Sequence, residues 1–164
     1  MNQKKKGTET AVIAAGCFWH VEDYFSKVPG VLKTRVGYAG GNTENPTYRQ
    51  VSSGKTGHAE SVEIVFDPKK ISFGKILAKF WQIHDPTTLN RQGPDVGTNY
   101  RSAIFCQNEA QIKAALRSRD ALQKKLPGKH IVTEIVKTTK FNPAEEFHQK
   151  YYEKQGMSSC GDCS

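Results

Sequence analysis

The chain has 164 residues, of which 37% are hydrophobic and 24% charged, and it carries neither repeats nor low-complexity tracts. This length and composition exclude a mainly disordered protein and predict one domain with a substantial buried core. Lysine and arginine outnumber aspartate and glutamate by 24 to 16, but the resulting net charge of +8 is scattered along the chain, which favours a solvated basic surface and leaves a nucleic-acid-binding module as the alternative.

The N-terminal region is a polar tail over residues 1–9, and it resembles a secretory leader only superficially. The apolar run before Cys17 covers residues 11–16 alone, whereas the hydrophobic part of a signal peptide needs about 7–15 residues. The sequence contains no run that is typical of a membrane-spanning helix. We therefore expect the protein in the cytoplasm, where thiols stay reduced and cysteines tend to be catalytic or metal-binding.

Strands and helices alternate in the first half of the chain. The wholly apolar run over residues 11–15 predicts a strand buried on both faces, and the turn that follows leads into a helix ending near Ser26. Alternating apolar and polar residues predict a second strand over 31–38 and a third over 61–67. Between them lies a Gly/Asn/Ser-rich loop over 40–57, and loops of that length are usually functional or disordered.

The second half begins with a helix over 72–84, which Ser72 caps. The next segment, over 85–99, contains two prolines and two glycines, so we expect it to be irregular. A strand over 100–106 comes next, and then a helix over 108–126 that Asn108 caps. A second strand over 131–137, a helix over 142–154 opened by Pro143 and a polar tail over 155–164 follow.

This order of elements predicts an α/β (α+β) fold. We expect a single domain over residues 1–164, built as a two-layer sandwich in which helices pack on a mixed sheet. The polar tails over 1–9 and 155–164 lie outside that core.

Cys17 stands between the first predicted strand and the first predicted helix. A thiol at a helix N-terminus faces the partial positive charge of unpaired backbone N–H groups, which favours the thiolate. A free thiol of pKa about 8.5 is only a few per cent ionised at pH 7, and lowering the pKa to roughly 6.5 would make the thiolate the majority form. The alternative is a cysteine that only fills space at the strand end.

Cys160 and Cys163 form a C-x-x-C pattern in the C-terminal tail. The pattern alone is compatible with half of a zinc site, a redox pair or an accident. A zinc site needs a second such pair or suitably spaced histidines, which the sequence lacks, so we favour a dithiol that reaches a distant thiol and predict no metal. Cys106 lies beside apolar residues in a predicted strand, and we expect it to be an inert core residue.

A carboxylate stands on the apolar face of the third predicted strand. Period-two alternation puts Glu60 on the side of Val62 and Ile64, where lost hydration raises the pKa of a carboxyl. A carboxylic acid that is still protonated near pH 7 can donate a proton in catalysis. From periodicity alone, a Glu60 that points into water is an equal alternative, and Asp95 is as compatible with a turn as with a site.

Six sequence blocks occur in order along the chain. They are GCFW at residues 16–19, VGYAGG at 36–41, PTY at 46–48, GHAE at 57–60, HDPTTLNRQGPDVGTNYRSAI at 84–104 and EFHQ at 146–149. Together they resemble the A-type peptide methionine sulfoxide reductases over roughly residues 11–155. The resemblance implies a ferredoxin-like core for the predicted sandwich.

By this resemblance, the chain is expected to reduce the S epimer of methionine sulfoxide, both in proteins and as the free amino acid. Cys17 matches the nucleophile that attacks the sulfoxide sulfur, and Glu60 matches the acid that protonates the sulfoxide oxygen. Tyr48 and Tyr100 match hydroxyl groups that assist this protonation and contact the substrate.

The resemblance also implies residues that hold the substrate. Phe18 and Trp19 match an aromatic wall that receives the S-methyl group, although aromatic pairs of this kind are more often part of a core. Asp95 matches a polar residue that positions the substrate. His148 lies in one of the matching blocks, and its role stays open.

The family chemistry agrees with what the single residues predict. A sulfoxide oxygen leaves only when protonated, so a thiolate and a neutral acid must coexist. Attack leaves Cys17 as a sulfenic acid, which condenses with a nearby thiol to a disulfide. Cys160 matches a first recycling cysteine, whereas Cys163 departs from the longer spacing of a second one, so either thiol can meet thioredoxin, the implied reductant. We expect a monomer without cofactor, and neither nucleic acid nor membrane as a partner.

Overall fold

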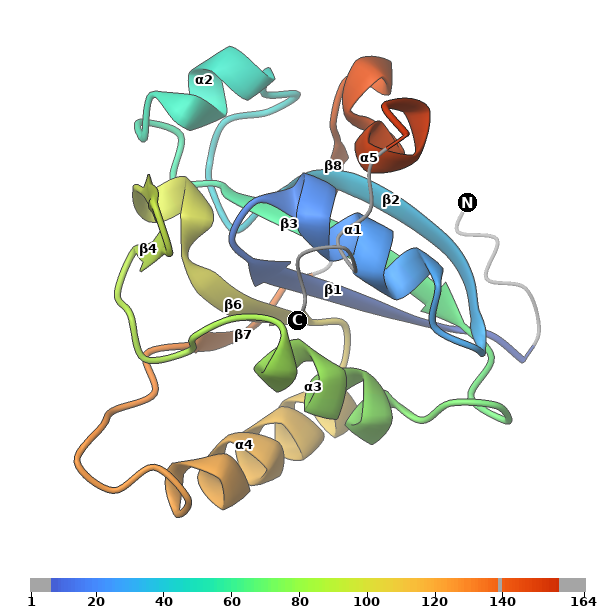
Figure 1. The fold of residues 1–164 in the computed structure, drawn as a ribbon, viewed down its shortest axis with the longest axis vertical. Helices are drawn as coiled ribbons and strands as arrows, with labels where there is room; N and C mark the ends of the chain where they lie inside the picture. Colours follow the sequence, from blue (N-terminus) through green and yellow to red (C-terminus); the bar gives the residue numbers. More distant parts are fainter. Residues whose placement is uncertain (1–6, 139, 157–164) are drawn as a thin grey trace.

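A computed structural model of the chain describes residues 7–138 and 140–156, and Figure 1 shows its elements. The helical elements are α1 (Phe18–Ser26), α2 (Tyr48–Ser52), α3 (Phe73–Gln82), α4 (Glu109–Gln123) and α5 (Tyr151–Lys154), with two 3₁₀ turns, η1 (Thr98–Tyr100) and η2 (Glu146–His148). The strands are β1 (Glu9–Ala15), β2 (Val31–Ala39), β3 (Ala59–Phe66), β6 (Ser102–Cys106), β7 (Glu134–Lys137) and β8 (Asn142–Pro143), with a separate hairpin of β4 (Arg91–Gln92) and β5 (Asp95–Val96).

The main sheet has the strand order β7-β6-β1-β3-β2-β8. All neighbouring strands are antiparallel except β6 and β7, which are parallel. Its inner four strands follow the chain order β1-α1-β2-β3-α3-β6, which is the ferredoxin-like arrangement. The predicted mixed sheet with packed helices is therefore confirmed.

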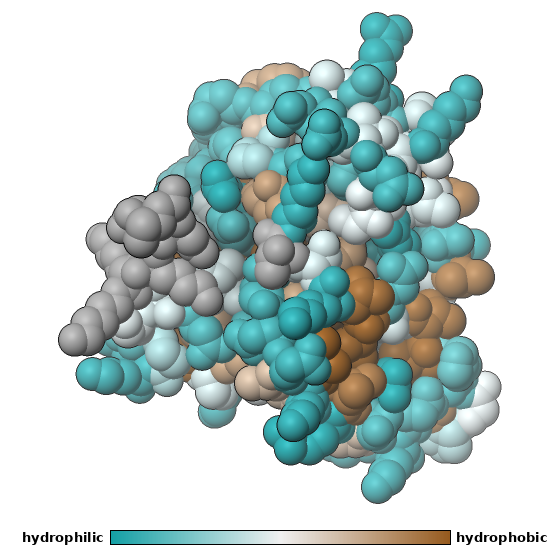
Figure 2. Space-filling view, turned by 180° about the vertical axis from the view of Figure 1, so that it is seen from behind, coloured by the Kyte–Doolittle hydropathy of each residue, from teal (hydrophilic) through white to brown (hydrophobic). Residues whose placement is uncertain are grey.

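Helices α1, α3 and α4 lie on one side of the sheet, the front in Figure 1. The side chains of β1 alternate accordingly: Ala11, Ile13 and Ala15 join the larger core beneath the helices, whereas Val12 and Ala14 face the other side. A smaller apolar cluster on that second side includes Phe105 and packs against Phe141. Seen from behind, hydrophilic residues cover most of the surface and apolar residues gather in its lower half (Figure 2).

Two helix starts are fixed by the side chains that the sequence predicted. Ser72 Oγ accepts the Lys75 N–H at 3.1 Å, and Asn108 Oδ1 accepts the Gln111 N–H at 2.9 Å. The predicted loop over 40–57 contains a helix that was not predicted, α2. A reciprocal capping box between Thr47 and Gln50 begins it.

The register of β1 against β3 positions the N-terminus of α1. The pair is antiparallel, with Ile13 opposite Val62, so the C-terminal end of β1 lies beside the N-terminal end of β3. Cys17 follows β1 and Glu60 is the second residue of β3. The pairing therefore brings these two residues to the same edge of the sheet.

The predicted helix over 142–154 is wrong. Asn142 and Pro143 pair with β2 instead, and only the 3₁₀ turn η2 and the one-turn helix α5 follow. The cause is tertiary: the Gln149 side chain accepts the Val36 N–H and donates to the Val36 carbonyl oxygen, both at 2.9 Å. These bonds hold the segment against β2, and local helix propensity does not outweigh them.

Two smaller differences concern strands. The predicted strand over 131–137 begins only at Glu134. In β2 the register shifts between Val31 and Lys33, and Leu32 is exposed although it alternates in phase with the buried Thr34 and Val36. None of the helices in the described part of the chain is long and apolar enough to cross a bilayer.

Candidate active site

Cys17 occupies the N-cap position of α1, as the sequence predicted. The chain reaches it through Gly16, whose φ of 94° lies in the left-handed region that favours glycine. A Cβ on Gly16 would lie 2.9 Å from the Gln92 side chain, so glycine also allows β4 to approach closely. The thiol is partly buried and unpaired.

Glu60 lies against the peptide that follows Cys17. The backbone N–H of Phe18 donates to Glu60 Oε1 over 3.1 Å, and this bond is buried. Only 1% of Glu60 is exposed, which confirms that it points into the apolar side of β3 rather than into water. Its second oxygen, Oε2, has no hydrogen-bond partner among the described residues.

Burial dominates the titration of the Glu60 carboxyl. It raises the pKa of Glu60 to about 8, although the Phe18 N–H lowers that pKa. The Asp95 charge raises it further, and a hydrogen bond from the Asn99 side chain lowers it. The carboxyl is therefore mostly protonated at pH 7. A protonated carboxyl with a free Oε2 is a hydrogen donor.

The predicted fall in the pKa of Cys17 is wrong for this structure. Burial raises the pKa of the Cys17 thiol to about 11, and the Glu60 charge adds to the rise. The backbone N–H groups of Trp19 and His20 do lower it, as the helix N-terminus predicts, but desolvation outweighs them. At pH 7 the thiol and the acid are thus both protonated.

Aromatic rings surround the first turn of α1. The Phe18 ring centroid lies 5.7 Å from that of Tyr38, 6.4 Å from that of Tyr48 and 5.4 Å from that of the His148 ring. Trp19 stacks on Tyr151 with centroids 3.8 Å apart and planes inclined by 10°. Phe18 is fully buried, whereas Trp19 is half-buried, so Trp19 is the more accessible ring of the pair.

The predicted residues Asp95, Tyr48 and Tyr100 converge on the same place from three different elements. The Asp95 charge, from β5, acts on both Cys17 and Glu60. Burial raises the pKa of Tyr100, and the neighbouring Glu60, Tyr48 and Asp95 add to the rise. All three side chains are half-buried, so they line the exposed side of the site.

Three polar residues of the site did not receive a role from the sequence. Asn99 in η1 is 3% exposed and His148 in η2 is 1% exposed. Trp19 Nε1–H donates to His148 Nδ1 over 2.9 Å. Glu145 accepts the Tyr38 hydroxyl and the Tyr48 N–H, both at 2.9 Å. No local pattern signals these contacts, because each joins segments that are distant in the sequence.

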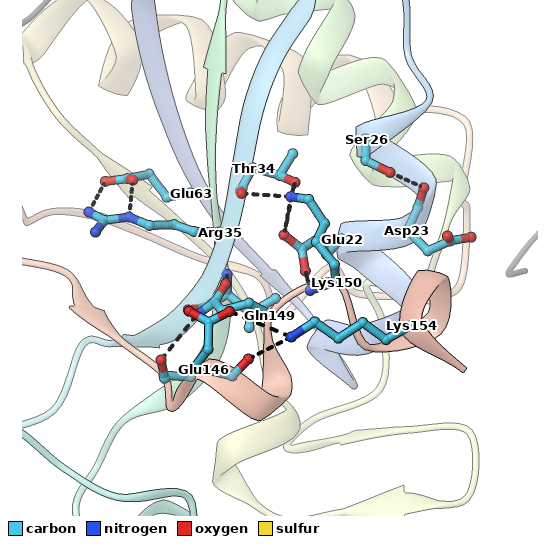
Figure 3. Close-up of polar contacts among 12 residues, drawn as sticks. Glu22, Asp23, Ser26, Thr34, Arg35, Glu63, Glu146, Gln149, Lys150 and Lys154 are labelled. Atoms are coloured by element: carbon cyan, nitrogen blue, oxygen red, sulfur yellow. Dashed lines mark hydrogen bonds and ion pairs between the residues drawn. The ribbon is translucent and has the colours of Figure 1, made fainter. Parts of the chain in front are cut away.

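The segment 142–151, which we call the C-terminal strap, is anchored by an ion pair whose carboxylate is buried. Lys150 Nζ lies 2.8 Å from Glu22 Oε2 and donates to the Thr34 carbonyl oxygen, also at 2.8 Å (Figure 3). The Lys150 N–H donates to Glu22 Oε1 at 2.7 Å. Glu22 is 1% exposed, and Lys150 has a left-handed φ of 54°. The strap is thus fixed to α1 and β2 just before the chain continues into its C-terminal tail.

Of the remaining three cysteines, only Cys106 lies within the described residues. Cys106 is fully buried in β6 and burial raises its pKa to about 11, in agreement with the predicted inert role. Cys160 and Cys163, and with them the redox-pair and zinc alternatives, lie outside the described residues. Within the described part of the chain no three His, Cys, Asp or Glu residues are grouped so that they could hold a metal ion.

Comparison with known proteins agrees with this site. The family model "Peptide methionine sulfoxide reductase" matches residues 9–162. The chain is 56% identical over 149 residues to a peptide methionine sulfoxide reductase MsrA of Methanococcoides burtonii, which covers 89% of this chain and 96% of that protein. A relative of the same name from Geobacter sulfurreducens is 54% identical over 155 residues, covering 93% of this chain and 94% of that protein.

Solved structures agree as well. Methionine sulfoxide reductase A of Corynebacterium diphtheriae superimposes with a TM-score of 0.87 at 39% identity, over 95% of this chain and 79% of that one. Mxr1 of Saccharomyces cerevisiae in its reduced form gives a TM-score of 0.87 at 34% identity, over 93% and 88% of the two chains. The chain belongs to the peptide methionine sulfoxide reductase family, and it is an oxidoreductase that reduces methionine sulfoxide.

Proposed function

We propose that the chain reduces the S epimer of methionine sulfoxide, in proteins and as the free amino acid, through a sulfenic acid on Cys17. The observation that supports this most is the bond from the Phe18 N–H to Glu60 Oε1, because it holds a protonated carboxyl beside the thiol. In the overall step the Cys17 thiol and the sulfoxide become Cys17 sulfenic acid and a thioether. Oxygen moves to the cysteine sulfur, and two electrons move to the substrate sulfur.

Glu60 acts as the general acid in this proposal. Its Oε1 is occupied by the Phe18 N–H, so its proton is available at Oε2. Transfer of that proton to the sulfoxide oxygen makes the substrate sulfur electron-poor, which allows attack by Cys17. Because the carboxyl loses its proton in this step, the thiol proton of Cys17 is available to restore it.

Cys17 becomes a thiolate only in the presence of substrate. The raised pKa keeps the thiol protonated in the free protein, whereas an electron-poor sulfur beside it favours the charged form. The N–H groups of Trp19 and His20 then stabilise the thiolate at the start of α1. This order of events keeps the cysteine unreactive until a sulfoxide is bound.

The residues around this pair bind the substrate. Phe18 and Trp19 form the wall for the S-methyl group, and the stacking of Trp19 on Tyr151 gives that wall a fixed orientation. Hydrogen-bond donors that lie near developing charge lower the barrier of the reaction. The Tyr48 and Tyr100 hydroxyls are therefore assigned to the sulfoxide oxygen, and Asp95 positions the substrate at the open side.

Recycling is assigned to the C-terminal tail. The sulfenic acid of Cys17 condenses with the Cys160 thiol to a disulfide and water, and Cys163 can take over that disulfide. Thioredoxin supplies the two electrons that restore the thiols; a structure of the related yeast Mxr1 is described as a complex with Trx2. We propose a monomer acting in the cytoplasm on oxidised proteins, without a cofactor and without nucleic acid or membrane as partners.

The decisive test uses dabsyl-methionine sulfoxide of either configuration with dithiothreitol as reductant. The wild-type protein should convert the S epimer and spare the R epimer, and Cys17→Ser should abolish conversion. Cys106→Ala, which removes an equally free but fully buried thiol, should retain activity. Mass spectrometry with a 1,3-diketone trap should find a sulfenic acid on Cys17 when Cys160 and Cys163 are both replaced by serine. Activity that survives Cys17→Ser would end the proposal.

A further inference from the structure

Three buried polar atoms at the site lack hydrogen-bond partners among the described residues. They are Glu60 Oε2, Asn99 Nδ2 and His148 Nε2, on residues that are at most 3% exposed. Buried polar atoms in folded proteins almost always have a partner, because an unsatisfied one costs about 1–3 kcal/mol. Their occurrence together indicates a site that water or a ligand completes.

Each of the three atoms is a hydrogen donor. Burial keeps the Glu60 carboxyl protonated near pH 7, and its Oε1 already accepts a bond from Phe18. The Asn99 Nδ2 belongs to an amide NH₂ group, which only donates. His148 Nδ1 accepts the Trp19 N–H, so the neutral imidazole carries its hydrogen on Nε2. The missing partner is therefore an acceptor.

Asn99 is the one of the other two donors that acts directly on the Glu60 carboxyl. The turn η1 packs against β3, and the Asn99 side chain acts as a hydrogen-bond donor to the Glu60 carboxyl, which lowers the pKa of Glu60. This contact is loose, because Nδ2 of Asn99 and Oε2 of Glu60 still lack a well-formed hydrogen bond among the described residues. The amide and the second carboxyl oxygen thus lie side by side in the site.

The position of the Asn99 amide is set by its neighbour Gly97. A Cβ on Gly97 would lie 2.6 Å from Asn99 Oδ1, so a larger residue there would displace the amide. Gly97 also has a φ of 143°, which disfavours other residues. The amide oxygen faces this glycine, which leaves the NH₂ group directed away from it.

A sulfoxide oxygen is the kind of partner that these donors lack, because it is a strong hydrogen-bond acceptor and carries no hydrogen. We propose that Asn99 is a substrate-binding residue whose amide NH₂ donates to the sulfoxide oxygen, next to the proton that Glu60 delivers. This assignment rests on the proposed function and adds to it a second donor from η1. Asn99 transfers no proton itself. It holds the oxygen in line with the Glu60 proton and stabilises the carboxylate that the transfer leaves behind.

The test separates binding of the oxygen from binding of the rest of the substrate. In a Cys17→Ser background, which prevents turnover, calorimetry or NMR titration measures Kd for N-acetyl-methionine-(S)-sulfoxide methylamide and for the corresponding thioether. Asn99→Ala should weaken binding of the sulfoxide about tenfold, or roughly 1.4 kcal/mol, and leave binding of the thioether unchanged. Equal weakening of both ligands would show a merely structural role, and no change in either would also overturn the assignment.

Turnover supplies the second readout, with Cys17 present. Asn99→Ala should lower kcat about 10²-fold, which is typical of losing one donor to a developing charge. Asn99→Asp keeps the shape of the side chain but lacks the NH₂ group, so it should lose activity to a similar extent while folding normally. Gln111→Met is the matched control: Gln111 is also a buried amide, 2% exposed, but it binds the Thr10 carbonyl oxygen between α4 and β1.

These outcomes keep the two proposals apart. A wild-type protein without S-sulfoxide reductase activity would end the proposed function and, with it, the assignment of Asn99. An active wild-type protein whose Asn99 variants retain full kcat would end the assignment of Asn99 alone. Loss of activity in Gln111→Met to the same extent as in Asn99→Ala would show that removing any buried amide is sufficient, and would overturn the assignment as well.

Discussion

The backbone N–H of Phe18 donates to Glu60 Oε1 over 3.1 Å. This contact joins the start of a helix to the second residue of a strand, and it leaves one carboxyl oxygen free beside the thiol of Cys17. A backbone donor survives every side-chain substitution except proline, so the orientation of the carboxyl is a property of the fold. The chemistry of the acid can therefore be changed without moving its position.

Glu60→Gln should separate orientation from acidity. The amide oxygen can still accept the Phe18 N–H, but the side chain no longer carries a proton for transfer, so kcat should fall roughly 10²–10⁴-fold. In the wild-type protein, activity should decline as the pH rises through about 8, where the Glu60 carboxyl loses its proton. The residual activity of the variant should lack this decline. A variant with the same alkaline limb would show that another group causes it.

The same substitution should change how stability depends on pH. The pKa of Glu60 is raised from 4.5 to about 8, so between these values the folded state binds one proton more than the unfolded state. The wild-type protein should therefore lose up to about 1.4 kcal/mol of unfolding free energy per pH unit in this window, relative to Glu60→Gln. Urea unfolding of both proteins at pH 5, 6.5 and 8 measures the difference, and parallel curves would contradict the raised pKa.

His148 should position Trp19. His148→Leu leaves the Trp19 N–H without its acceptor, so the aromatic wall loses its fixed orientation. We expect KM for the sulfoxide to rise on the order of tenfold, which corresponds to the cost of one unsatisfied donor, with a much smaller change in kcat. His148→Gln offers an amide oxygen in its place and should recover part of the affinity. His130→Leu, at an exposed histidine, serves as the control, and an effect on kcat alone would contradict a positioning role.

The pair of Glu22 and Lys150 should stabilise the strap. Lys150→Met leaves the buried Glu22 carboxylate without its cation, and loss of one partner of a buried pair costs about 3–5 kcal/mol. Because the Lys150 side chain is 36% exposed, we expect a loss near the lower end of that range in denaturant unfolding. The double variant Glu22→Gln with Lys150→Met should recover much of it, since no charge stays buried. A double variant as unstable as Lys150→Met would contradict this account.

Cys160→Ser should affect recycling only. A single equivalent of sulfoxide should still be converted without reductant, and dithiothreitol should still support turnover, because a small thiol can reduce the sulfenic acid directly. Turnover driven by thioredoxin should stop. Unchanged cycling with thioredoxin would show that another cysteine resolves the sulfenic acid, and Cys163→Ser tested in parallel identifies whether it is that one.

The fold followed from the sequence wherever the signal was local and periodic. The apolar run of β1, the alternation of β3 and the caps Ser72 and Asn108 all depend on neighbouring residues, and the structure agrees with them. The prediction of a helix in the C-terminal strap was wrong for the opposite reason. Its conformation depends on bonds from Gln149 to β2 and from Lys150 to α1, and such long-range contacts leave no local pattern.

The site divides in the same way. The position of Cys17 at a helix start and the apolar side of Glu60 were visible in the sequence, but the pKa of the thiol was not, because it depends on how deeply packing buries it. No local sequence pattern indicates the role that we propose for Asn99, because that role depends on the contact of η1 with β3, which is distant in the sequence. The capping box of α2 was an available signal: Thr47 followed three residues later by Gln50 marks a helix start.

The antiparallel register of β1 with β3 also limits how the chain can change in length. One residue inserted into or deleted from β1 would turn the following side chains to the opposite face of the sheet and carry the sulfur away from its acid. The connection from α4 to β7 contributes none of the site residues described above, so it is free to lengthen or shorten. Among related genomes we expect insertions and deletions to accumulate in that connection and to be absent from β1 and β3.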